Sequence, residues 1–206
     1  MRIPFDFSFD SRSTHSETAT EAPVSPSSPC PSGEFPGGEI PGTFASLSRF
    51  NSSAEADARA ALREVCASSA WAGRLLAGRP YADTPSLLAA SDTATAELTA
   101  DDLAEAMSAH PPIGRPAPPG AASAREQSGM TEASDALRAE MHRLNLAYQR
   151  RFGHVFLICA TGLTGEQMRD AVRERIGNPP AREREIVRTE LGGINRIRLT
   201  RLVADA

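Results

Sequence analysis

The sequence contains no lysine, because all 22 of its basic residues are arginine. A Schiff base with pyridoxal phosphate needs a lysine, and so does a P-loop that binds nucleotide phosphates. Both kinds of site are therefore excluded. Any chemistry must use histidine, carboxylate, arginine, serine or backbone groups.

Long apolar runs, closely spaced cysteine pairs and a strong net charge are also missing. No stretch approaches the roughly 20 apolar residues of a membrane helix, and the first ten residues, which include two acids, do not resemble a secretory signal. We therefore expect a cytoplasmic protein. The three cysteines form no CxxC pair, and no His, Cys or carboxylate pair has metal-site spacing, so we predict no metal. A net charge of -4 gives no reason to expect nucleic acid or membrane as a partner.

The composition changes near residue 43. Residues 18–42 are dense in Pro, Ser and Gly and carry few apolar side chains, so they cannot bury enough surface to offset the entropy of ordering. We predict a disordered tail over residues 1–43 and one folded domain over residues 44–206.

The folded part shows helical periodicity and helix-start signals along most of its length. The Thr99 and Thr164 patterns are typical of capping boxes, in which a hydroxyl and a side chain three residues later bond to the first free N–H groups. The sequence predicts an all-α bundle of about seven helices, over residues 54–71, 86–90, 99–107, 123–126, 132–151, 164–177 and 180–203. The six apolar residues 155–160 fit either a short buried strand or a helix segment.

His110 begins the most unusual local string, His-Pro-Pro-Ile-Gly. It lies where a helix is expected to end, and the helix dipole there favours a protonated imidazole. Pro111 and Gly114 would hold the turn in one shape, as a positioned acid requires. The simpler alternative is a histidine that caps a helix before a proline.

A second string, Ser123-Ala-Arg-Glu126-Gln127, is separated from His110 by a short loop. The simplest interpretation is a capping box in which Glu126 bonds back to a backbone N–H. The functional interpretation is an anion site at a helix start that carries a Ser, a Glu and a Gln. If the loop folds the two strings face to face, a His and a Glu share one pocket, as acid–base chemistry needs.

Other polar residues have simpler explanations. We expect His142 to be solvated, His154 to be structural and Tyr148 to lie in the core. The last helix carries six arginines, but interleaved acids such as Glu183, Glu185 and Glu190 favour a salt-bridged solvated face over a nucleic-acid surface.

Taken together, these strings resemble one family. His110-Pro-Pro-Ile-Gly, Ser123-x-x-Glu-Gln, Leu144-Asn-x-x-Tyr-x-x-x-Phe-Gly153 and Arg175-Ile-Gly-Asn178 are similar in order and spacing to the 2-oxo-4-hydroxy-4-carboxy-5-ureidoimidazoline (OHCU) decarboxylases. Trp71 and the closing Arg198-Leu199 helix are also similar to that family. The likeness covers about residues 44–203.

The resemblance implies an all-α, commonly dimeric enzyme that converts OHCU to (S)-allantoin and CO2 in urate breakdown without a cofactor. It implies that His110 and Glu126 are the catalytic pair. It also implies substrate contacts at Pro111, Ser123 and Gln127, and along the backbone of Phe156, Leu157, Ile158, Cys159 and Ala160. The implied partners are a second copy of the chain and, in the pathway, urate oxidase and hydroxyisourate hydrolase.

Two alternatives stay open from the sequence. A non-catalytic helical interaction module would keep the fold without needing His110 and Glu126 together. A decarboxylase of a related ureido compound would differ only in its pocket walls.

Overall fold

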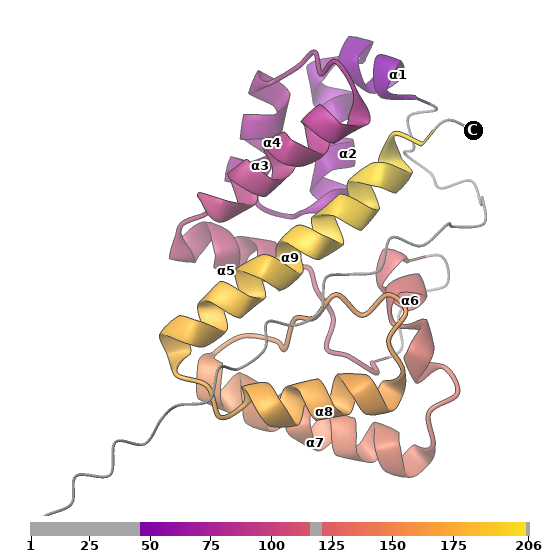
Figure 1. Ribbon diagram of the computed structural model, residues 1–206, viewed down its shortest axis with the longest axis vertical. Helices are drawn as coiled ribbons and strands as arrows, with labels where there is room; N and C mark the ends of the chain where they lie inside the picture. The colour runs from indigo at the N-terminus through magenta and orange to yellow at the C-terminus, as the bar shows by residue number, and fades with distance from the viewer. Residues whose placement is uncertain (1–45, 116–120, 205–206) are drawn as a thin grey trace, which may run out of the picture.

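The computed structural model describes residues 46–115 and 121–204, and all the regular secondary structure in these ranges is helical (Figure 1). The described residues form nine α-helices and one 3-10 turn: α1 Leu47–Ser52, α2 Glu55–Val65, α3 Ser69–Ala77, α4 Thr84–Ala96, α5 Ala100–Ser108, α6 Ala122–Glu126, η1 Ser128–Met130, α7 Asp135–Phe152, α8 Gly165–Arg175 and α9 Pro180–Leu202. The all-α prediction is confirmed. The predicted disorder of residues 1–43 falls outside the described residues.

The helix count exceeds the predicted seven for two reasons. One is α1, which the sequence pattern missed. The other is a break in the helix predicted over residues 54–71, which was wrong as a single element. Cys66 is extended (φ -144, ψ 125), and the Ser68 hydroxyl then accepts a hydrogen bond from Trp71 N–H to start α3. This new cap turns the chain so that Trp71 is fully buried.

Capping boxes fix the starts of three helices. The predicted boxes are confirmed at Thr99 for α5 and at Thr164 for α8. A third box joins Asp83 and Ser86, and it starts α4 earlier than the predicted residue 86. Helix α4 also continues to Ala96, so it is much longer than predicted. In each box a side chain satisfies an N–H group that lacks an intrahelical partner.

The long helix α9 crosses the molecule diagonally and joins its two halves (Figure 1). Helices α2 and α4 pack against α9, α3 packs on α2, α4 and α5, and α7 pairs with α8 at the other end. Each half has its own buried cluster. One holds Trp71, Leu75 and Leu191, and the other holds Met141, Tyr148 and Met168. No helix in the described ranges is long and apolar enough to cross a membrane.

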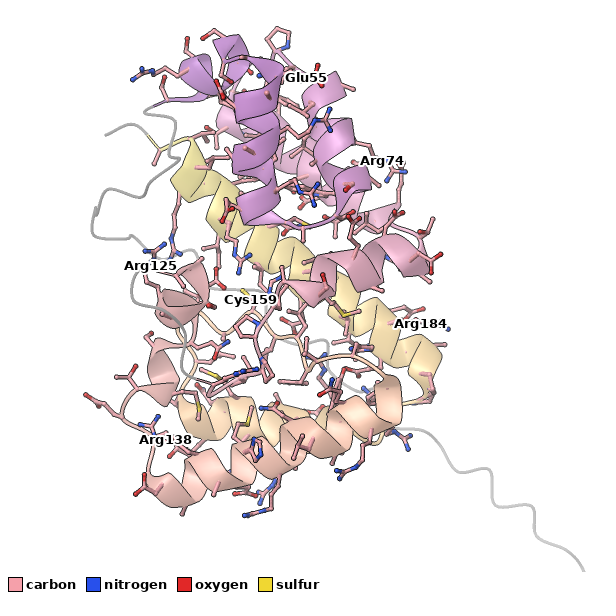
Figure 2. The ribbon with its side chains drawn as sticks, turned by 180° about the vertical axis from the view of Figure 1, so that it is seen from behind. Glu55, Arg74, Arg125, Arg138, Cys159 and Arg184 are labelled. Carbon is pink, nitrogen blue, oxygen red and sulfur yellow. The ribbon has the colours of Figure 1, made fainter. Side chains whose placement is uncertain are left out.

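Residues 155–160 form an irregular segment between the two clusters, with residues 156–160 buried, and neither a strand nor a helix is assigned there. Side chains alternate along it. Phe156, Ile158 and Ala160 join the α7–α8 cluster, while Leu157 and Cys159 join the cluster around α9. Both sides of the segment are therefore covered by protein, which explains six apolar residues in a row. Figure 2 shows Cys159 in the middle of the molecule, between the two halves.

Candidate active site

His110 lies just beyond the end of α5 and is buried, with 8% of its surface exposed. Its backbone N–H donates to Met107 O at 3.0 Å, which closes the last turn of the helix. The following Pro111 and Pro112 cannot extend this bonding, because proline has no N–H. The chain therefore leaves the helix at His110, as predicted.

Glu126 is the last residue of α6 and is also buried, at 7% exposure. The predicted capping box between Ser123 and Glu126 is wrong, because α6 starts after Ala121 and has no side-chain cap. The Glu126 carboxylate instead accepts two hydrogen bonds from Arg198, from Nε to Oε1 at 2.7 Å and from Nη2 to Oε2 at 2.8 Å. The alternative of an anion site at this helix start stays a prediction.

Arg198 comes from α9, and sequence reasoning missed its place in the site. The prediction of a solvated arginine face on α9 is wrong here, because the Arg198 side chain is only 13% exposed. Its third nitrogen, Nη1, donates to Val65 O at 2.9 Å, a carbonyl at the end of α2. One signal could have found it. Arg198 stands seven residues after the buried Leu191 and four after the buried Ile194, so it shares their inward face.

The three side chains form one electrostatic unit. Burial, together with the positive charge of Arg198, lowers the pKa of His110 to about 4, although the Glu126 carboxylate opposes this shift. The expectation that the helix end would favour a charged imidazole is therefore wrong. Burial alone would raise the pKa of Glu126, but the hydrogen bonds and charge of Arg198 outweigh it and leave that pKa below its usual value. At neutral pH the free site holds a carboxylate, a guanidinium and a neutral imidazole.

The loop after His110 is tied to Gln127, the residue that follows Glu126. Gly114 N–H donates to Gln127 Oε1 at 3.0 Å. The two predicted strings therefore lie together, as the short loop between them suggested. Pro111 and Ser123 are partly buried in the same strings, and their substrate contacts stay predictions.

The segment from Phe156 to Ala160 borders this loop. Ile113, three residues after His110, belongs to the same buried cluster as Phe156, Ile158 and Ala160. On the other side of the segment, Cys159 N–H donates to Glu190 Oε2 at 2.8 Å. The Cys159 N–H group therefore already has an acceptor within the protein.

Residues 51–200 match the OHCU decarboxylase family. The chain belongs to this family. A 2-oxo-4-hydroxy-4-carboxy-5-ureidoimidazoline decarboxylase of Amia calva is 33% identical over 147 residues, which are 68% of this chain and 80% of that protein. The uric acid degradation bifunctional protein TTL of Arabidopsis thaliana is 31% identical over 147 residues, which are 68% of this chain. The chain spans 45% of the length of that bifunctional relative.

Two solved structures are similar to this member of the OHCU decarboxylase family. A crystal structure of OHCU decarboxylase in the presence of (S)-allantoin superposes with a TM-score of 0.62 at 27% identity, over 68% of this chain and 95% of that chain. An (S)-allantoin synthase superposes with a TM-score of 0.57 at 20% identity, over 75% of this chain and 52% of that chain. The second likeness supports the fold alone.

The other polar residues that the sequence singled out, His142, Tyr148 and His154, have structural partners or lie on the surface. His142 is exposed, as expected. Tyr148 is fully buried, as expected, and its hydroxyl donates to Glu183. Burial, reinforced by that carboxylate, raises the pKa of Tyr148. His154 Nδ1 lies 2.9 Å from Val155 O, and its ring packs edge-on against Tyr148.

The predicted solvated face of α9 is also wrong for Glu183 and Glu190, which are buried. Arg175 pairs with Glu183 through Nε at 2.9 Å and Nη2 at 2.6 Å, and its Nη1 lies 3.7 Å from Glu190 Oε1. The Arg175 guanidinium carbon also lies 4.5 Å from the centre of the Phe156 ring. A buried ion network therefore supports the 156–160 segment.

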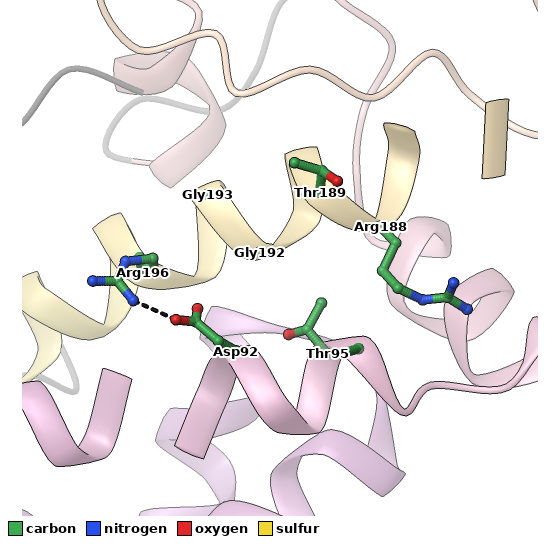
Figure 3. Close-up of a pocket in the computed structure, with 8 residues that line it drawn as sticks. Asp92, Thr95, Arg188, Thr189, Gly192, Gly193 and Arg196 are labelled. Atoms are coloured by element: carbon green, nitrogen blue, oxygen red, sulfur yellow. Dashed lines mark hydrogen bonds and ion pairs between the residues drawn. The ribbon is translucent and has the colours of Figure 1, made fainter. Parts of the chain in front are cut away.

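A separate groove of about 300 Å³ lies between α4 and α9 (Figure 3). Small residues such as Gly192 and Gly193 line it, and none of the predicted site residues does. At one end Arg196 pairs with Asp92, and at the other Arg188 donates to Leu98 O. The two guanidinium groups point away from each other in Figure 3, so they do not converge on a shared ligand.

Proposed function

We propose that this protein converts OHCU to (S)-allantoin and CO2, with His110 and Glu126 as its catalytic pair and Arg198 as the residue that joins them. The observation that carries the proposal is one buried unit in which Arg198 holds both oxygens of Glu126, while burial and the charge of Arg198 together keep His110 neutral. Membership of the family supports OHCU as the substrate, and the buried unit contains the groups that we assign to acid–base chemistry.

Loss of CO2 leaves the bonding electron pair on the ring carbon that carried the carboxylate. That carbon, position 4 of the ring, is bonded to position 5, which forms a C=N double bond in the imidazoline. The electron pair moves into this bond, so the negative charge comes to lie on a ring nitrogen. The substrate thus serves as its own electron sink, in agreement with a chain that has no lysine. The reaction then needs one proton, delivered to one face of the ring.

His110 is placed to handle that proton. Its pKa of about 4 in the free site keeps the imidazole neutral at pH 7. A substrate carboxylate beside the imidazole adds negative charge, which raises this pKa on binding. The bound imidazole can then carry the proton that the ring takes up when CO2 leaves.

Glu126 and Arg198 complete the charge pattern. A carboxylate oxygen has two lone pairs, so each Glu126 oxygen can accept a substrate N–H or O–H in addition to its bond from Arg198. The nearby Glu126 charge also favours the protonated state of His110 during proton transfer. Ser123 and Gln127 would hold the ureido and ring polar groups. The apolar residues Phe156 to Ile158 would exclude water and strengthen these contacts.

The proposal includes a homodimer in the cytoplasm, supplied with its unstable substrate by urate oxidase and hydroxyisourate hydrolase. Membership of a family of urate degradation supports the pathway context. Light scattering of the purified chain tests the dimer directly, and a mass equal to one chain would contradict it.

The reaction itself is tested by producing OHCU in place from urate with the two upstream enzymes and measuring its rate of loss. We expect wild type to accelerate the loss and Glu126→Gln to slow it by about 100-fold or more, because the neutral amide no longer balances Arg198. Arg196→Met is the matched control, since Arg196 is an exposed arginine of the same helix paired with Asp92. An OHCU half-life that wild type leaves unchanged would refute the proposal.

A further inference from the structure

The peptide group between Ile113 and Gly114 is held from both sides by side-chain amides. Asn145 Nδ2 on α7 donates to Ile113 O at 2.8 Å, and Gly114 N–H donates to Gln127 Oε1 at 3.0 Å. One carbonyl and one N–H of the same peptide plane are therefore fixed by two different elements.

This plane controls the loop that begins at His110. Pro111 and Pro112 restrict the backbone between His110 and Ile113. Gly114 has φ +79, and a Cβ there would lie 3.1 Å from Met130 Cε. With a restricted start and a clamped end, the loop has little freedom to move the imidazole.

The same contacts fix which end of the Gln127 amide faces a ligand. Because Oε1 accepts from Gly114 N–H, the Nε2 group is the end left to donate. Asn145 is 8% exposed, and its Nδ2 donates to the carbonyl on the other side of the plane. If this peptide plane flipped, Gly114 N–H would face Asn145. Gln127 Oε1 would then lose the donor that now fixes the orientation of its amide.

We propose that Asn145 is a positioning residue: through the Ile113–Gly114 peptide it holds the His110 loop and makes Gln127 present an N–H donor to a carbonyl of the substrate. This inference rests on the proposed function for its substrate, a ureido compound whose C=O can accept that donor. The clamp itself can be tested without activity.

The structural test uses selective labelling. The sequence contains two Ile-Gly pairs, Ile113-Gly114 and Ile176-Gly177. Protein labelled with carbonyl-13C isoleucine and 15N glycine therefore gives two correlated amide signals, of which the second is an internal control. In Asn145→Leu we expect the Gly114 signal to shift or broaden while the Gly177 signal stays in place. Two unchanged signals would overturn the clamp.

Leucine is a suitable replacement because Asn145 Oδ1 is buried and has no hydrogen-bond partner within the described part of the chain. Removing that acceptor offsets part of the lost Nδ2 bond. The matched control is Asn51→Leu. Asn51 on α1 also holds a backbone, donating to Tyr81 O at 2.8 Å and accepting from Tyr81 N–H at 3.0 Å. Figure 1 shows α1 at the opposite end of the molecule from α7 and α8.

The activity test compares kcat and KM for OHCU. We expect Asn145→Leu to lower kcat about 10- to 100-fold, because a small displacement of a reacting group costs that much. Asn51→Leu should stay within about twofold of wild type in kcat, on the additivity of distant sites. Equal kcat values for Asn145→Leu and wild type would overturn the positioning role.

Gln127→Glu tests the donor end separately. A carboxylate still accepts from Gly114 N–H, so the Gly114 signal should persist, but no N–H remains for the substrate. We expect kcat/KM to fall at least about tenfold, the usual cost of leaving a polar partner unpaired. Unchanged kcat/KM would overturn the donor role. If wild type were inactive toward OHCU, the proposed function would be refuted. The Gly114 signal in Asn145→Leu would then still test whether Asn145 holds the Ile113–Gly114 peptide.

Discussion

Arg198 contacts Glu126 through two hydrogen bonds, and its charge adds to the effect of burial in lowering the pKa of His110. A histidine beside a carboxylate alone would have a raised pKa, because the opposite charge favours the imidazolium. In this site burial and the guanidinium reverse that direction. The neutral imidazole at pH 7 thus follows first from the burial of His110 and then from the charge of Arg198, against the effect of Glu126.

Replacing Arg198 with methionine should therefore raise the pKa of His110 above its value of about 4, toward the usual 6.5, while burial still lowers it. The replacement removes the positive charge and leaves Glu126, whose charge favours the imidazolium. NMR titration measures this directly, since the chain has four histidines. The acid limb of kcat/KM should move to higher pH with it.

Arg196→Met is the control for this titration, because Arg196 is exposed and pairs with Asp92. It should leave the His110 titration in place. A His110 pKa that stays near 4 in Arg198→Met would show that burial alone sets the charge state.

At this scale the sequence was enough to nominate His110, Glu126 and Gln127, because each stands in an unusual local string. It was not enough to pair Glu126 with Arg198, since 72 residues separate them. Local rules favoured a capping role for Glu126, and a tertiary ion pair replaced that role. Charge patterning likewise placed Arg198 on a solvated face, although its seven-residue spacing from Leu191 indicated burial.

At the scale of elements, buried charged side chains connect helix α9 to the 156–160 segment. Arg175 pairs with Glu183, which also accepts from Tyr148, while Glu190 holds Cys159 N–H. The carboxylates of Glu183 and Glu190 and the guanidinium of Arg175 are thus buried next to the apolar segment. Such a network is costly to break, because a single replacement leaves an unpaired buried charge.

We expect Arg175→Met to lower the free energy of unfolding by about 3–5 kcal/mol, measured by urea denaturation followed by circular dichroism. The matched control is Arg182→Met, since Arg182 pairs with Glu185 on the exposed side of α9. That change should cost less than about 1 kcal/mol. Equal losses for the two variants would contradict a structural role for the network.

Helix starts were predictable where the cap is local. Thr99 and Thr164 each bond within their own turn, and both starts were predicted correctly. The break between α2 and α3 was not predictable from periodicity, because apolar spacing continues across Cys66. A distant group also supports that break, since Arg198 donates to Val65 O at the end of α2.

Residues 155–160 illustrate a related limit. Six consecutive apolar residues indicated burial but not conformation. The structure resolves the ambiguity, because odd and even side chains enter different clusters. An extended segment between two helical clusters needs no neighbouring strand to be fully buried.

At the scale of the whole molecule, the folded domain and the preceding 43 residues are predicted to be separable. The family match begins at residue 51, and the proposed site residues all lie between 110 and 198. We expect deletion of residues 1–43 to leave kcat/KM for OHCU unchanged, because these residues lie outside the family match. A large loss of rate in the truncated chain would show that the tail belongs to the enzyme.

The most direct test of the central claim is the handedness of the allantoin formed from urate. Urate oxidase and hydroxyisourate hydrolase generate OHCU in one cuvette, and circular dichroism follows the product with wild type, with His110→Ala and with no added protein. If His110 delivers the proton to one ring face, wild type gives (S)-allantoin rapidly and the variant loses about 100-fold or more of the rate. Slow racemic allantoin from wild type, at the rate of the cuvette without it, would contradict the account.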